Sequence, residues 1–247
     1  MMGNARAGAM GSAMVGILGL LAARSMAYDA APVVNGGTIT GTIHYAGPVP
    51  SRGVLEVTKD EAVCGSTAKL ANDLVVGSSG GLQYAVVSLR GVAAGKPFDG
   101  APATLDQRGC EYTPHVVIVP AGKDLSILNS DGVLHNIHTS SLRPEAAANP
   151  PVNRAQPKFK TSMTESFRAA ETLRVSCDVH RWMQGWIVVA DHPYYAVTDA
   201  EGRFTLADVP PGDYQLDAWH ETLGEMTKSV SVAAGATSTV AAEMVPR

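Results

Sequence analysis

The sequence has few charged residues, few aromatic residues and only three cysteines. Charged residues make up 17% of its 247 residues and aromatic residues 6%, and Lys and Arg form no run. Because the formal net charge is −4, we expect no nucleic-acid partner. A hydrophobic share of 45% excludes intrinsic disorder for the bulk of the chain. The sequence also lacks a phosphate-binding loop, a zinc-protease motif and a nucleophile–base pattern, so we do not expect an enzyme.

Long hydrophobic runs are absent too. The N-terminal run from Ala13 to Ala23 is interrupted by glycine and is shorter than the roughly 20 apolar residues that a membrane span needs. Arg6 precedes this run, and Ser25-Met26-Ala27 follows it with small residues at the two positions that a signal peptidase reads. We therefore expect residues 1–27 to be a cleaved signal peptide. The mature protein should be periplasmic or secreted, without a membrane span.

Short segments in which apolar and polar residues alternate occupy most of the mature chain, and helix signals are scarce. Turns rich in Gly and Pro separate these segments at intervals of roughly ten residues, as in β-sandwiches. The pattern predicts an all-β protein with a long loop over residues 142–160. The clearest predicted strands are Thr38–Tyr45, Gln83–Leu89, His115–Val119, Gly185–Ala190 and Tyr214–Trp219.

The three cysteines divide into a predicted pair and one free thiol. In an oxidising compartment two of the three should be bonded, and Cys64 and Cys110 lie in turn-like contexts that suit a disulfide. We expect this pair to lie away from Cys177, on the far side or at the base of the sandwich. Cys177 is followed by His180 and Met183, and a soft metal is the usual occupant beside such a thiol.

One group of residues carries metal-binding chemistry. His135 lies at a predicted strand end, and Cys177, His180 and Met183 share a loop about forty residues later. Two imidazoles, a thiolate and a weak thioether are the ligands of an electron-transfer copper site. The alternative is that the histidine decorates the surface and that the methionine packs in the core beside Trp182. The four residues together favour copper.

Residues 128–138 and 175–189 resemble the cupredoxin family, the blue-copper fold of plastocyanin and amicyanin. The resemblance extends over residues 77–191 and implies a Greek-key sandwich. It also implies an exported type-1-like copper protein that carries electrons between redox partner proteins, with no open position for a substrate. The implied copper ligands are His135, Cys177, His180 and Met183.

The same resemblance assigns roles around this site. Asn136 falls on an asparagine that braces the cysteine loop, which is an indirect role. His180 lies on the connecting loop and is the expected exposed edge through which electrons leave. His115 and His138 are further imidazoles that we do not expect to bind the metal.

The final block, residues 192–247, resembles the prealbumin-like regulatory domains of carboxypeptidases and a β-domain of rhamnogalacturonan lyases. The residues that carry this resemblance are Thr198–Leu206 and Val209–Tyr214. Both families belong to carbohydrate-binding-like folds, so a small prealbumin-like β-sandwich is expected. Residues 36–76 begin with a strand that could pair with this domain, which would make the copper module an insertion.

An alternative function follows from this second resemblance. The protein would be an extracellular carbohydrate- or surface-binding module, with a vestigial or copper-storage site. Tyr194, Tyr195, Trp219 and His220 are the candidate lining of a polysaccharide site, although the interpretation that we favour for them is packing in the core and between the domains.

Overall fold

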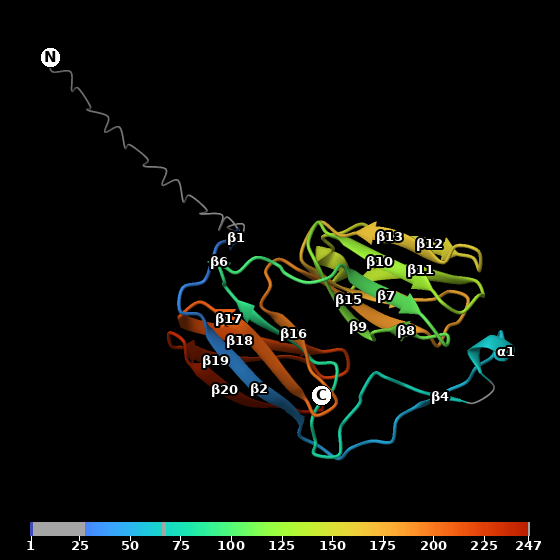
Figure 1. Ribbon diagram of the computed structural model, residues 1–247, viewed down its shortest axis with the longest axis horizontal. Coiled ribbons are helices and arrows are strands. Elements are labelled where there is room, and N and C mark those ends of the chain that lie inside the picture. Colours follow the sequence, from blue (N-terminus) through green and yellow to red (C-terminus); the bar gives the residue numbers. More distant parts are fainter. Residues whose placement is uncertain (2–27, 66–67, 247) are drawn as a thin grey trace.

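The computed structural model describes residue 1, residues 28–65 and residues 68–246, and it consists mainly of β-strands (Figure 1). The predicted all-β class is confirmed. The predicted signal peptide lies outside the described residues except for Met1. Within the described residues, the helices are a single turn, α1 (Glu61–Cys64), and a 3-10 turn, η1 (Pro144–Ala146). No helix there has the length and apolar character required to cross a membrane.

The strands follow one another in this order: β1 (Asp29–Ala30), β2 (Gly37–Tyr45), β3 (Val54–Leu55), β4 (Lys69–Leu70), β5 (Val86–Arg90), β6 (Ala94–Gly95), β7 (Ala103–Gln107), β8 (Tyr112–Thr113), β9 (Val116–Pro120), β10 (Asp124–Asn129), β11 (His135–Ser141), β12 (Asn153–Gln156), β13 (Ser162–Ser166), β14 (Glu171–Ser176), β15 (Gln184–Ala190), β16 (Tyr195–Val197), β17 (Arg203–Val209), β18 (Gly212–His220), β19 (Gly224–Val232) and β20 (Thr237–Met244).

Two sheets made from both ends of the chain form one sandwich, which we call the outer domain. One sheet has the order β17-β2-β20 and the other β16-β5-β18-β19. β2 runs parallel to β20 and antiparallel to β17, so the N-terminal strand lies in the sheet of the C-terminal block. Ile39, Ile43, Leu216 and Val240 are among the buried residues between the two sheets.

The second sandwich, which we call the insert domain, is built from β7 to β15. Its sheets have the orders β13-β10-β7-β8 and β12-β11-β14-β15-β9. Alternating apolar residues such as Leu125, Ile127, Leu173 and Val175 fill the space between them. Part of the loop predicted over residues 142–160 is in fact β12, because residues 153–156 pair with β11 at the edge of the sheet.

The pairing of β5 differs from the predicted range of the copper module. That range begins at residue 77 and includes β5, but β5 pairs with β16 and β18 of the outer domain. The physical reason is its burial pattern, since Val87 and Leu89 complete the outer-domain core. The insert domain therefore begins after β5, and its strands lie between β5 and β16 in sequence (Figure 1).

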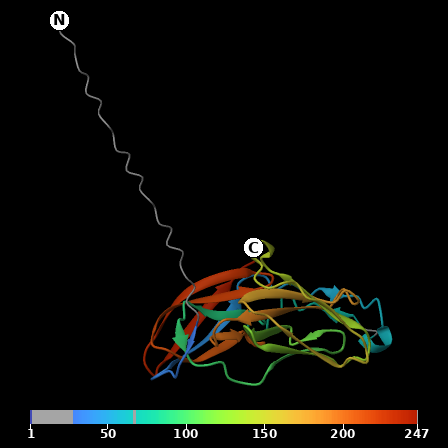
Figure 2. The same ribbon diagram turned by 90° about the horizontal axis from the view of Figure 1, so that it is seen from above.

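The two domains pack against each other through β15. Ile187 and Val189 on one face of β15 lie in the core of the insert domain, whereas Trp186 and Val188 on the other face belong to a separate apolar cluster with Val86 of β5. The Trp186 and Trp219 rings meet edge to face, with centroids 4.8 Å apart. Seen from above, the two sandwiches lie side by side in an elongated molecule (Figure 2).

A substitution at Gly41 of β2 can test how closely the strands of the outer-domain sheet pack. A Cβ atom at this position would lie 2.3 Å from the Val240 carbonyl oxygen and 2.6 Å from the Phe204 ring, so Gly41→Ala must displace a neighbouring strand. We expect this change to lower the free energy of unfolding by about 1–3 kcal/mol, measured by urea denaturation. Gly53→Ala is the matched control, because its Cβ would meet only Ala71 at 3.6 Å. Equal urea midpoints for the two variants would contradict this packing.

Candidate metal centre

The four predicted ligands come from two neighbouring strand ends of the insert domain. His135 is the first residue of β11, and the other three lie in the loop between β14 and β15. The loop is closed by two backbone hydrogen bonds: Met183 N–H donates to the His180 carbonyl at 2.9 Å, and Cys177 N–H donates to the Met183 carbonyl at 3.3 Å. The four residues are at most 2% exposed. The loop therefore turns three side chains away from solvent.

Three donor atoms of this group face a common point. The Cys177 Sγ atom lies 3.9 Å from His135 Nδ1 and 3.8 Å from His180 Nδ1. The two Nδ1 atoms are 2.9 Å apart. Met183 is buried in the apolar core that also contains Cys177. These three donors lie close enough together to bind a single metal ion.

In each of the two imidazole rings, a carboxylate is hydrogen-bonded to the Nε2 atom, on the side away from the sulfur. Asp131 Oδ2 lies 2.9 Å from His135 Nε2, and Asp60 Oδ2 lies 2.9 Å from His180 Nε2. Because a carboxylate only accepts hydrogen bonds, each Nε2 carries a proton, and the neutral rings then turn Nδ1 lone pairs toward each other and toward the sulfur. Three electron-pair donors are stable together only when a cation or a proton lies among them. The donor set therefore fits a metal ion.

Burial and hydrogen bonding shift the pKa values of the three donor groups in opposing directions. Burial lowers the pKa of His135, but hydrogen bonds to Asp131 and Cys177 outweigh it and raise the pKa to about 9. For His180, burial lowers the pKa more than the hydrogen bond to Asp60 raises it. Burial raises the pKa of the Cys177 thiol, yet the hydrogen bonds from His135 and from the backbone lower it overall. The two imidazole rings therefore differ in the direction of their pKa shifts, upward at His135 and downward at His180.

Asn136 fixes the backbone next to the cysteine. Its Oδ1 accepts a hydrogen bond from Asp178 N–H at 2.6 Å, and its Nδ2 donates to Asp178 Oδ2 at 2.9 Å. His138 bonds the other oxygen of Asp178 at 2.9 Å from a half-exposed position. His115 is buried against Glu221 of the outer domain. Neither His138 nor His115 belongs to the His135–Cys177–His180 group.

The predicted Cys64–Cys110 disulfide is confirmed, with Cα atoms 5.1 Å apart. Its predicted place on the far side of the sandwich is wrong. The two sulfur atoms and a ring nitrogen of His180 all lie within 4.8 Å of one another. The reason is that α1, which ends at Cys64, lies over the ligand loop, where Asp60 reaches His180.

The expectation of an exposed His180 edge is also wrong, because His180 is 0% exposed. Asp60 occupies its Nε2 edge, and the Trp182 ring lies 5.1 Å from the His180 ring. Sequence reasoning missed both carboxylates. Asp131 could have been recognised in the sequence, because it precedes His135 by only four residues. Asp60 belongs to no motif.

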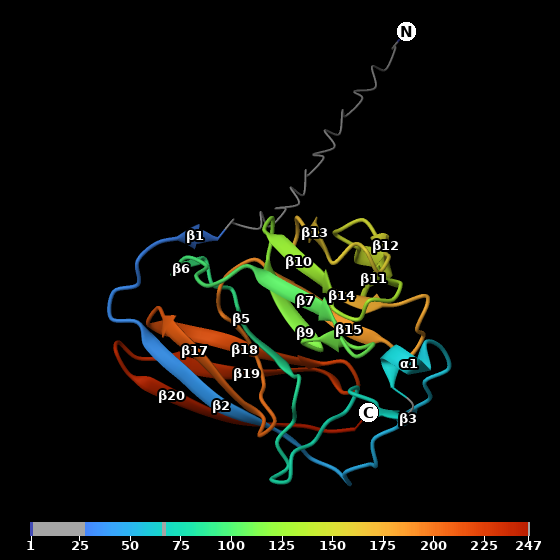
Figure 3. The same cartoon turned by 45° about the vertical axis from the view of Figure 1, so that its right-hand side comes forward.

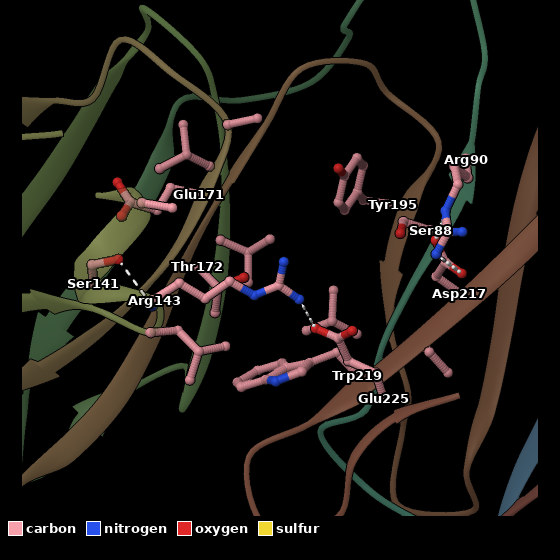
Figure 4. Close-up of a pocket in the computed structure, with 17 residues that line it drawn as sticks. Ser88, Arg90, Ser141, Arg143, Glu171, Thr172, Tyr195, Asp217, Trp219 and Glu225 are labelled. Atoms are coloured by element: carbon pink, nitrogen blue, oxygen red, sulfur yellow. Dashed lines mark hydrogen bonds and ion pairs between the residues drawn. The ribbon is translucent and has the colours of Figure 1, made fainter. Parts of the chain in front are cut away.

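A separate cleft of about 430 Å³ lies between the two domains (Figure 4). Trp219 and Tyr195 line it, but the other two predicted members of a sugar platform do not: Tyr194 and His220 are buried in the outer domain. Tyr194 is held there by its hydroxyl, which donates to the Asp208 carbonyl at 2.9 Å. The charged residues of the cleft include two ion pairs, Arg90–Asp217 and Arg143–Glu225.

Residues 183–245 match the family model of the carboxypeptidase regulatory-like domain. This match confirms that the C-terminal block resembles these regulatory domains. It begins at Met183, the last residue of the ligand loop. No curated protein is significantly similar to the chain.

Among solved structures, the similar proteins include copper proteins. Amicyanin from Paracoccus versutus (Thiobacillus versutus) is 16% identical over 38% of this chain and 85% of its own, with a TM-score of 0.32. A Cu(I) amicyanin variant is 18% identical over 42% of this chain and 98% of its own, with a TM-score of 0.31. A Cu-containing nitrite reductase from Thermus scotoductus SA-01 is 18% identical over 38% of this chain, with a TM-score of 0.31, and only 24% of the reductase is covered.

The state of the cysteines can be checked directly. Protein denatured without reductant should expose one thiol per chain, and peptide mapping should find Cys64 linked to Cys110 and the alkylating label on Cys177. In the folded protein Cys177 should react slowly, because it is only 2% exposed. A peptide in which Cys177 itself forms a disulfide would contradict this arrangement and would remove the thiol from the candidate site.

Proposed function

We propose that this protein is an exported type-1-like copper protein that carries electrons between redox partner proteins. The observation that supports it is the convergence of His135 Nδ1, His180 Nδ1 and Cys177 Sγ, with both Nε2 edges bonded to carboxylates. Thiolate and thioether ligands favour Cu(I), and imidazole suits both oxidation states. His135, Cys177, His180 and Met183 would hold the copper. Copper would supply one-electron redox chemistry.

The surroundings favour an electron carrier over an enzyme. A set of four protein ligands leaves no position for a substrate on the metal. The ligands are buried, and the Asn136–Asp178 hydrogen bonds fix the backbone beside Cys177, so the donor atoms have little room to rearrange. Export is part of the proposal, because disulfides such as Cys64–Cys110 persist in oxidising compartments.

Copper loading tests this function. Protein loaded with one equivalent of Cu(II) should turn blue or green, with a thiolate-to-copper absorption band toward the orange-to-red end of the visible spectrum, and a reductant should bleach it reversibly. Cys177→Ser should abolish the band because the thiolate is lost. His138→Ala is the matched control and should keep it, since His138 bonds Asp178 outside the donor group. A colourless complex that Cys177→Ser leaves unchanged would rule out this function.

The interdomain cleft supports a second function, the binding of an extracellular polysaccharide. Trp219 and Tyr195 offer aromatic surface, and Arg143 and Glu225 reach into the cleft from different domains (Figure 4). A few polar groups among aromatic side chains are typical of small-molecule sites. Because the arginines of the cleft are paired with carboxylates, a neutral ligand rich in hydroxyl groups suits it best.

Arg143→Ala tests the cleft without touching the ligand loop. We expect the wild-type protein to be retained on at least one polysaccharide of a glycan array, and the variant to lose about tenfold in affinity, since a hydrogen bond to a charged group contributes about 1.5–3 kcal/mol. Arg203→Ala is the matched control: both arginines form ion pairs, and their side chains are 64% and 65% exposed. Retention on no polysaccharide, or equal retention of both variants, would reject this second function.

A further inference from the structure

Residues 54–65, which we call the cover, lie over the ligand loop although they precede the insert domain in sequence (Figure 3). Val57 and Cys64 pack against the core of the insert domain. Leu55 lines a small cavity with Trp182 and Met183. The cover is therefore an added layer between the metal centre and solvent.

Asp60 is the residue of the cover that reaches the site. Its Oδ2 bonds His180 Nε2 at 2.9 Å, and its side chain is 36% exposed while that of His180 is 0% exposed. At this edge of the site, the Asp60 carboxylate contacts solvent and the His180 ring does not. Asp60 has φ 52°, a left-handed conformation that is uncommon without glycine and persists only where the surroundings fix it. Its carbonyl accepts hydrogen bonds from the N–H groups of Val63 and Cys64, which ties it to α1.

One disulfide connects the two carboxylates that hold the imidazole rings. Cys64 at the end of α1 is bonded to Cys110, and the Cys110 N–H donates to Asp131 Oδ2 at 2.7 Å. The Cys110 carbonyl also accepts a hydrogen bond from Trp182 Nε1 at 3.1 Å, within the ligand loop. A continuous path therefore runs from Asp60 through the disulfide to Asp131, around the outside of both rings.

We propose that the Cys64–Cys110 disulfide locks the cover over the metal centre and that Asp60 is a positioning residue for His180. This proposal rests on the copper function proposed above. The Asp60 carboxylate fixes the ring and its Nε2 proton, so that Nδ1 faces the metal, and it makes the ring a more basic ligand. A more basic ligand stabilises Cu(II) relative to Cu(I). The locked cover prevents His180 from swinging out, which slows the loss of metal.

The experiment compares four purified, copper-loaded variants with the wild type: Asp60→Ala, Asp60→Asn, Glu61→Ala and the double variant Cys64→Ser/Cys110→Ser. A chelator in excess is added, and the decay of the copper band gives the rate of metal extraction. Asp60→Ala should raise this rate about tenfold or more and shift the reduction potential to a more positive value. Asp60→Asn keeps an acceptor oxygen without charge and should lie between Asp60→Ala and the wild type. The double variant should also lose copper faster.

Glu61→Ala is the matched control, because Glu61 is an exposed acidic neighbour on the same turn. It should behave as the wild type in rate and potential. A metal-free readout accompanies these measurements: an imidazole-acylating reagent, mapped by mass spectrometry, should leave His180 unmodified in the wild-type apoprotein and modify it in Asp60→Ala. The half-exposed His138 reports that the reagent is active.

The possible outcomes distinguish a failure of this proposal from a failure of the copper function on which it rests. If the wild-type protein forms no copper band, the copper function fails, whatever the cover does. If the band forms but Asp60→Ala matches the wild type in extraction rate, potential and His180 labelling, the positioning role is overturned and the copper function stands. If the double variant matches the wild type in extraction rate while Asp60→Ala loses copper faster, the lock is overturned. Should the double variant fail to fold, Asp60→Ala still decides the role of the cover, because it keeps the disulfide.

Discussion

The opposed imidazole rings of His135 and His180 are the constraint on which the rest of the site depends. Both rings donate outward from Nε2 to a carboxylate, so both Nδ1 atoms face inward at a separation of 2.9 Å, with the Cys177 sulfur beside them. Buried donors in this arrangement repel one another unless a cation lies among them. Asp131 in the β10–β11 connection, Cys177 in the β14–β15 loop and Asp60 directly before α1 each supply one of the contacts that hold the rings in place.

β15 connects the candidate metal centre to the other domain. The strand begins directly after Met183, and every residue from Gly185 to Ala190 is buried. One face packs inside the insert domain, and the other presents Trp186 to Trp219 of the outer domain. A strand buried on both faces cannot shift its register without exposing apolar side chains to solvent. The ligand loop and the interdomain cleft are therefore positioned by the same rigid element.

The sequence alone could indicate those features that depend on neighbouring residues. Alternation predicted the strands, and the spacing of Cys177, His180 and Met183 within one turn predicted a common loop. Asp60 could not be found in this way, because 120 residues separate it from His180 and their contact exists only once two parts of the chain are packed together. The burial of His180 and the place of the disulfide depend on the same packing. The pairing of β5 was hidden for a similar reason: its alternating pattern fits either sandwich equally well.

The two halves of the site differ in how they are built. His135 and its partner Asp131 are four residues apart, and the Asp131 side chain is nearly buried, so this half of the site consists of residues of the insert domain alone. His180 depends instead on Asp60, which comes from outside the insert domain and is partly exposed. The pKa directions show the same asymmetry, since the buried carboxylate raises the pKa of His135 whereas burial prevails at His180 and lowers it. The Cys64–Cys110 disulfide joins these two halves covalently, because both of its sulfur atoms lie near a ring nitrogen of His180 and Cys110 also lies near Asp131 and His135.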